Sequence, residues 1–273
     1  AAVQAGPRGS HQADQRDHSG SAGASPSPFE ALPESTQAIF LNEWALYLSQ
    51  LGRLEAAAHC HELHLEVEMQ REDWKNSTIT NQNLCDVRLL SGRLLEKGEE
   101  GSDKRETTSP VTLLSSSFPE SLRLAELADD AQERQNSYAS RGHARALLGE
   151  VPAALSDFHT ALDWQHKDEG DDERPLYSGR GIRHTDLLAR LGRRKESQRL
   201  TEANQEICLQ VFGAGDADPD VPQCRLILAS LQLDSGDVSA AERQCHAARD
   251  WALARDAKQV LCWSALVQAR IEL

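Results

Sequence analysis

Residues 137–164 read SYASRGHARALLGEVPAALSDFHTALDW, and this stretch decides the fold. Apolar and small residues recur three or four positions apart on both sides of the central LLGEV, which is the spacing of one α-helical face. The stretch therefore predicts two helices joined by a tight turn. Gly142 and Ala154 are small enough to let the two helices approach closely, with Tyr138 and Phe158 filling the space beside them.

A glycine corner between two periodic stretches recurs five times along the chain. The corners are separated by 40, 57, 43 and 44 residues, and they are Gly52, Gly92, Gly149, Gly192 and Gly236. Such self-similarity is typical of helical repeat arrays, and the order aromatic, Gly, Ala, aromatic, Ala resembles the tetratricopeptide (TPR) repeat of about 34 residues. We expect an all-α, TPR-like right-handed solenoid of about five and a half helical hairpins. Its structural repeat positions are Trp44, Gly52, Ala57, Gly92, Tyr138, Gly142, Gly149, Ala154, Phe158, Ala161, Gly192, Gly236 and Ala241.

Two segments depart from the repeat. Residues 1–31 are rich in Gly, Ser, Ala, Pro, Gln and His, so we expect a disordered linker or a segment derived from an expression tag. The solenoid is expected over residues 32–273. Residues 96–118 are charged and then Ser/Thr-rich, which predicts a long loop inserted into the second repeat. Charged residues at 167–174 predict a further loop between two later helices.

Composition and charge restrict the classes of partner. Apolar residues make up 39% of the chain and aromatic residues 5%, which is low for one round core and suits a solenoid. The formal charge of −14 disfavours nucleic acid as a partner, because phosphate backbones are repelled. No apolar run is long enough to cross a membrane. We expect free, mostly buried thiols in a reducing cytoplasm, at Cys60, Cys85, Cys208, Cys224, Cys245 and Cys262.

Polar residues recur where the first helix of each hairpin would face a concave groove. Arg180, Arg183 and His184 share one predicted helical face. An arginine holds an anionic group through two hydrogen bonds, so these positions fit a groove for a protein or peptide. The alternative is a solvated inner face with ion pairs between neighbouring helices. The predicted groove residues are Gln82, Asp86, Asn136, His143, Arg180, Arg183 and Asp186.

Neither catalysis nor a cofactor is indicated by any motif. The chain has no GxxxxGK[ST] phosphate loop and no GxSxG nucleophile motif. A metal site at His59, Cys60, His61 and His64 is the competing interpretation, but the spacing in HELH differs from that of zinc proteases by one residue. His61 also occupies the usual aromatic position of the repeat, which favours a packing role. We therefore expect no enzyme, no metal and no cofactor.

Two stretches resemble a particular class of bacterial protein. EDWKNSTITNQNLCDVRLLSGRL at 72–94 and PLYSGRGIRHTDLLARLGR at 175–193 are similar to segments in the TPR regions of bacterial STAND-class NTPases. These signalling proteins combine an N-terminal effector of TIR or protease type, a P-loop switch and a TPR sensor. The resemblance covers residues 33–273 and departs at the 96–118 insertion, at Gly179 and at His184.

The resemblance implies a sensing function without catalysis. A partner bound in the groove would favour one arrangement of the array and thereby release the nucleotide switch of the same polypeptide. In bacteria such sensors act in antiphage defence and stress signalling. The alternative is a stand-alone TPR adaptor or chaperone-like scaffold without a linked switch.

Overall fold

The computed structural model describes residues 29, 31–91, 117–171, 173–212 and 219–273. These residues form eleven α-helices and no strand, and none of the described helices is long and apolar enough to cross a membrane. The helices are α1 (Glu34–Gln50), α2 (Leu54–Gln70), α3 (Trp74–Leu90), α5 (Phe118–Leu127), α6 (Ala131–Leu147), α7 (Val151–Glu169), α8 (Ser178–Arg190), α9 (Arg194–Phe212), α10 (Asp220–Asp234), α11 (Val238–Arg255) and α12 (Lys258–Glu272).

The predicted glycine corners are confirmed wherever the structure describes them. Each of these glycines has a positive φ, between 71° and 86°, just after a helix end. Only glycine adopts this left-handed conformation at no steric cost, so the corner positions follow from backbone chemistry. They are Gly52, Gly149, Gly192 and Gly236, while Gly92 lies outside the described residues.

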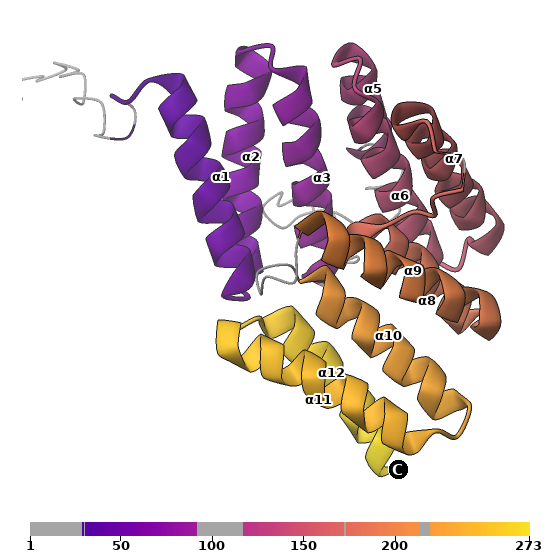
Figure 1. Cartoon of the computed structure of the whole chain (residues 1–273). Helices are drawn as coiled ribbons and strands as arrows, with labels where there is room; N and C mark the ends of the chain where they lie inside the picture. The colour runs from indigo at the N-terminus through magenta and orange to yellow at the C-terminus, as the bar shows by residue number, and fades with distance from the viewer. Residues whose placement is uncertain (1–28, 30, 92–116, 172, 213–218) are drawn as a thin grey trace, which may run out of the picture.

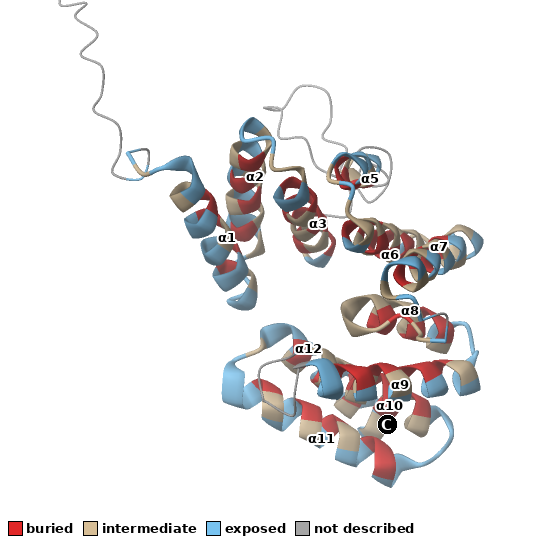
Figure 2. Cartoon of the chain, turned by 45° about the horizontal axis from the view of Figure 1, so that its top comes forward, coloured by how far each residue is buried: buried red, intermediate tan, exposed pale blue. Residues whose placement is uncertain are grey.

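From α1 to α7 and again from α8 to α12, each described helix packs against the next one in the chain (Figure 1). In addition, α3 packs on α6, α6 on α8, α8 on α10 and α10 on α12, so the first helices of successive hairpins form a continuous row. The array follows an open arc, with α1–α3 in one arm and α10–α12 in the other (Figures 1 and 2). The structure is therefore all-helical and built of consecutive hairpins, as the sequence predicts.

The hairpin α6–α7 confirms the predicted close approach. A β-carbon on Gly142 would lie 3.1 Å from the backbone oxygen of Ala154 and 3.2 Å from the β-carbon of Asp157. Ala154, Phe158 and Ala161 are buried there. The absence of a side chain at residue 142 therefore sets the distance between the two helices.

Asp157 joins the same two helices electrostatically. The carboxylate accepts two hydrogen bonds from Arg141, at 3.0 Å and 2.7 Å, and one from Arg145, at 2.8 Å. Its side chain is almost entirely buried, whereas both arginines are partly exposed. The carboxylate thus holds two guanidinium groups of α6 onto α7.

Trp44 was expected at a structural repeat position, and that prediction is wrong. Its side chain is 59% exposed, whereas Ala57 and Ala241 are fully buried as expected. The reason is that α1 lies at one end of the described array (Figure 2). No helix of another described hairpin covers the face of α1 that carries Trp44. Trp44 instead contacts Tyr47 on the same helix, with ring centroids 5.9 Å apart.

Two predicted loop boundaries are also wrong. Helix α7 continues to Glu169 and ends at Gly170, which has a φ of 67°, so the charged run from 167 is partly helical. Lys and Glu are good helix formers, and charge alone misled the prediction. Phe118 begins α5 and is buried against Cys85 and Leu89. The remaining expectations for residues 1–28 and 96–116 fall outside the described residues.

Candidate functional site

An open pocket of about 510 Å³ lies between α3, α6 and the start of α8. It contains five of the seven predicted groove residues, contributed by three successive first helices. Polar side chains dominate its wall, and Ile79, Tyr177 and Val211 add apolar surface. We call this hollow the inner pocket. Its lining residues are Ile79, Gln82, Asn83, Asp86, Gln132, Glu133, Asn136, Ser140, Tyr177, Ser178, Gly179, Arg180, Arg183 and Val211.

Arg183 connects the three helices of the inner pocket. One terminal nitrogen donates to the Ser140 hydroxyl at 2.7 Å, and the other donates to the Asp86 carboxylate at 2.5 Å. The pair Arg183–Asp86 confirms that ion pairs join the inner helices, which was the alternative interpretation of these residues. Because its charge is already balanced, Arg183 serves mainly to fix the pocket wall.

Arg180 is the more accessible cation for a ligand. A single terminal nitrogen donates to the side-chain oxygens of Gln135 at 2.7 Å and Asn136 at 3.3 Å. The guanidinium lies over the Tyr177 ring, 5.1 Å from its centroid. Both bonded partners are neutral amides, so no described carboxylate within ion-pair distance balances its charge. Arg180 can therefore accept an anionic group through its remaining N–H donors.

Gln82 and Glu133 form the buried end of the pocket. The Gln82 amide donates to the Ser137 hydroxyl at 2.8 Å and to the Glu133 backbone oxygen at 3.3 Å. The Glu133 side chain receives only long hydrogen bonds, at 3.4 Å from Gln82 and 3.5 Å from Asn136. Burial raises the pKa of Glu133, and the nearby Asp130 adds to the rise. The pocket thus offers acceptors as well as donors.

The start of α8 is held by residues that the sequence did not single out. Ser178 has a positive φ of 57°, and its backbone N–H donates to the Asn204 side chain at 2.6 Å. The Asn204 amide in turn donates to the Ser178 backbone oxygen at 3.1 Å. Gly181 allows this approach, because a β-carbon there would lie 2.3 Å from the backbone oxygen of Leu176. These contacts orient the helix that carries Arg180 and Arg183.

Two predicted groove residues, His143 and Asp186, do not line the inner pocket. Burial, together with the nearby Arg183 charge, lowers the pKa of His143 to about 4. Asp186 pairs with Arg190 of its own helix at 2.8 Å. Both side chains therefore lie outside the inner pocket.

His184 is also placed differently from the prediction. Its ring stacks on Phe158 with centroids 5.0 Å apart, so it packs against α7 and does not line the inner pocket. Consecutive residues of a helix point about 100° apart, which separates His184 from Arg183. Burial lowers the pKa of His184 to about 4. The histidine fills space between hairpins.

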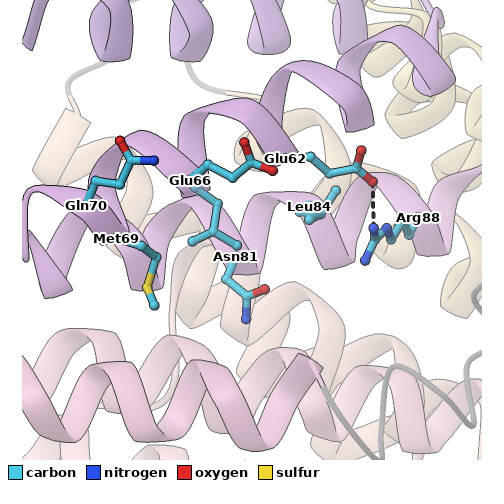
Figure 3. A pocket seen from close by; sticks show the side chains of 8 residues that line it. Glu62, Glu66, Met69, Gln70, Asn81, Leu84 and Arg88 are labelled. Atoms are coloured by element: carbon cyan, nitrogen blue, oxygen red, sulfur yellow. Dashed lines mark hydrogen bonds and ion pairs between the residues drawn. The ribbon is translucent and has the colours of Figure 1, made fainter. Parts of the chain in front are cut away.

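A second hollow of about 530 Å³ lies along α2 and α3 (Figure 3). Its surface includes the apolar Leu65, Met69 and Leu84, and an ion pair of 2.7 Å joins Arg88 to Glu62 across it. None of the predicted groove residues lines this hollow. It therefore stays separate from the inner pocket.

The histidines of α2 form a hydrogen-bonded structural cluster. The His64 ring contacts the Thr80 hydroxyl at 3.0 Å and Glu68 at 3.2 Å, and Arg71 donates to the other Glu68 oxygen at 2.9 Å. His61 is buried beside them, 1% exposed, as expected for a packing role. Among the described residues, no group of three or more His, Cys, Asp or Glu side chains is arranged to hold a metal ion.

The buried, neutral ring of His61 should make the stability of the fold sensitive to acid. Burial and the neighbouring His64 lower its pKa from 6.5 to about 4, so the unfolded chain binds more protons between these values. The stability from the neutral ring is fully present above pH 6.5 and is lost as the pH falls towards 4. On going from pH 7 to pH 5, the wild type should lose about 2 kcal/mol more stability than His61→Phe. Urea titrations at both pH values measure this difference, and equal losses in both proteins would contradict it.

Comparison with known proteins assigns no family. No protein-family model matches the chain, and no curated protein is significantly similar to it. The function must therefore be argued from the residues and their geometry.

Proposed function

We propose that this chain is a non-catalytic, TPR-like interaction module whose inner pocket binds an extended segment of a partner protein. The observation that carries the proposal is the convergence of Gln82, Asp86, Asn136, Arg180 and Arg183 on one open hollow. These residues are spread over about a hundred positions of sequence, and they come from three consecutive hairpins. A row of first helices offers such a surface to an elongated ligand.

The chemistry of the pocket favours a polypeptide over other ligands. Side-chain amides such as Asn83 and Asn136 both donate and accept hydrogen bonds, which matches the alternating groups of an extended backbone. Arg180 suits an acidic side chain of that segment. Ile79 and Val211 provide the apolar contact. A nucleic acid fits poorly, since the chain carries a formal charge of −14.

The wider biological setting rests on the resemblance of residues 72–94 and 175–193 to STAND-class NTPases. In that setting the module senses a partner inside the bacterial cytoplasm and relays binding to the nucleotide switch of a larger signalling or defence protein. Both quoted stretches contribute to the inner pocket, through α3 and α8. The same helices that carry the resemblance would thus carry recognition.

Gly179 provides a way to block the pocket without breaking its network. A β-carbon at this position meets no atom within 4 Å, and the residue lines the inner pocket. Gly179→Phe should therefore fill the hollow while leaving the fold intact. Peptides selected from a displayed random library on the wild type are expected to bind the variant at least tenfold more weakly, measured by fluorescence anisotropy.

Two matched variants complete this experiment. Arg190→Ala removes a cation of α8 outside the pocket and should leave peptide affinity unchanged. Arg180→Ala/Arg183→Ala should lower affinity for acidic peptides most strongly. If Gly179→Phe and the double variant both bind as the wild type does, the inner pocket is not the recognition site.

A further inference from the structure

The inner pocket contains a buried carboxylate that no cation among the described residues balances. Glu133 lies on the first turn of α6, is 3% exposed and lines the pocket. Two cations act on it from a distance, and both are bound elsewhere. Lys75 pairs with Asp130 at 2.7 Å, and Arg180 is bonded to two neutral amides. A buried carboxylate without an ion-pair partner is costly, so a cation supplied by a ligand would stabilise it.

One oxygen of this carboxylate is open to such a ligand. Glu133 Oε2 accepts the long hydrogen bonds from Gln82, at 3.4 Å, and Asn136, at 3.5 Å. No described residue donates to Glu133 Oε1, yet this atom is not sealed from solvent. The side-chain oxygen of Gln82 is likewise without a described donor and is not sealed. A donor that enters the pocket therefore meets Glu133 Oε1, with a second acceptor on the neighbouring amide.

The single open oxygen favours an ammonium group over a guanidinium group. A guanidinium binds a carboxylate best through both oxygens at once, whereas an ammonium is a compact charge that needs only one of them. At Glu133, the amides of Gln82 and Asn136 already contact Oε2. A lysine also carries an aliphatic stem, which can use the apolar part of the pocket wall that Ile79 provides.

Asn136 sets the spacing between this acceptor and the accessible cation of the pocket. Its side-chain oxygen accepts from Arg180 at 3.3 Å, and its nitrogen donates to Glu133 at 3.5 Å. Two hydrogen bonds and one amide group thus hold the opposite charges within about 9 Å of each other. In an extended segment, side chains two positions apart point the same way and lie about 7 Å apart. Two such side chains of one segment can therefore reach Arg180 and Glu133 together.

We propose that the segment bound in the inner pocket carries a lysine two positions from an acidic residue, with its ammonium on Glu133 and the acidic carboxylate on Arg180. This inference rests on the proposed function, because it concerns the same pocket. It adds a requirement that Arg180 alone does not impose, since an acidic segment without the lysine leaves the Glu133 charge unbalanced. Glu133 is then the residue that makes the pocket specific for a pair of opposite charges.

Parallel peptide selections on the wild type and on Glu133→Gln test this proposal. Both proteins are offered the same displayed random library at neutral pH. The wild type should enrich lysine two positions from Asp or Glu, whereas Glu133→Gln should retain the acidic residue and lose the lysine. Asp163→Asn removes a carboxylate of α7 outside the pocket and should select the same peptides as the wild type. An unchanged circular dichroism spectrum verifies that Glu133→Gln is folded.

Fluorescence anisotropy of the most enriched peptide then measures the lysine contact on the unaltered protein. Norleucine in place of the lysine keeps the aliphatic stem and should weaken binding to the wild type about tenfold. The same replacement should weaken binding to Glu133→Gln less than about twofold, because the carboxylate is already absent. Arginine in place of the lysine should also bind the wild type more weakly than the parent peptide.

The outcomes separate this inference from the proposed function. Acidic peptides without enriched lysine, or a norleucine peptide that binds the wild type as tightly as its parent, would overturn the assignment of lysine to Glu133. Equal binding of the arginine peptide would overturn the contact through one oxygen. In each case the pocket itself stands as long as Gly179→Phe weakens binding of the parent peptide. If Gly179→Phe binds that peptide as the wild type does, both proposals fail.

Discussion

Asp157→Ala is expected to lower the free energy of unfolding by about 3 to 5 kcal/mol. The carboxylate accepts three hydrogen bonds from Arg141 and Arg145 inside the α6–α7 hairpin. Its removal leaves two guanidinium charges beside each other, partly shielded from water and without their anion. The cost is larger than that of a surface ion pair because the carboxylate is almost completely buried.

Asp163→Ala is the matched control for this prediction. Asp163 lies on the same helix, is largely exposed, and pairs only weakly with His159 at 3.9 Å. Its loss should change stability by less than about 0.5 kcal/mol. Hydrogen exchange of α6 and α7 is the measurement, because repeat arrays can open one hairpin at a time. Equal protection in the two variants would show that the buried network contributes nothing.

Gly181→Ala is the second substitution with a large expected effect, a loss of about 3 kcal/mol or more. A β-carbon at this position would lie 2.3 Å from the backbone oxygen of Leu176 and 2.6 Å from the Asn204 amide nitrogen. The first contact involves backbone, so a rotamer change cannot relieve it. Helix α8 must move away from the turn before it, which also displaces Arg180 and Arg183.

Gly179→Ala gives the comparison two residues earlier on the same helix. Its β-carbon meets no atom within 4 Å, so the substitution should be neutral or stabilise α8 by up to about 1 kcal/mol. Thermal melts of both variants followed by circular dichroism distinguish the two sites. Similar melting temperatures for Gly181→Ala and Gly179→Ala would refute the steric account of Gly181.

The repeated hairpins were predictable because their causes are local. Glycine corners and apolar periodicity depend on a few neighbouring residues. In the stretch 137–164, one helix ends at Leu147 and the next begins at Val151, on either side of the predicted corner at Gly149. The N-terminal cap of α3 is equally local, since the Asp73 side chain accepts from the Asn76 backbone. Such features depend on backbone geometry and capping, which a single sequence displays.

The partners within the candidate site were not predictable, because they are distant in sequence. Asp86 and Arg183 are 97 residues apart, and Arg180 reaches Gln135 across 45. Periodicity placed these residues on inner helices but could not tell which side chains pair across them. His184 shows the same limit, since its contact with Phe158 depends on how α8 packs against α7. Exposure of Trp44 follows from its terminal helix, which no periodicity reveals.

The inner pocket combines a fixed wall with one accessible cation. The ion pair of Arg183 with Asp86 orders α3, α6 and α8, while Arg180 is bonded only to neutral amides. A ligand can therefore bind Arg180 without breaking an internal ion pair. This division predicts that Arg183 variants lose stability as well as affinity, whereas Arg180 variants lose mainly affinity.

Site-specific photocrosslinking tests the central claim of recognition in the inner pocket most directly. A photoreactive benzoylphenylalanine is placed at position 190, outside the pocket, or at position 83, whose side chain lines it. Labelled peptides selected on the wild type should form an adduct at position 83 and little adduct at position 190. The same peptide without the label should suppress the adduct at position 83. Equal adducts at both positions, or an adduct at position 190 alone, would contradict binding in the inner pocket.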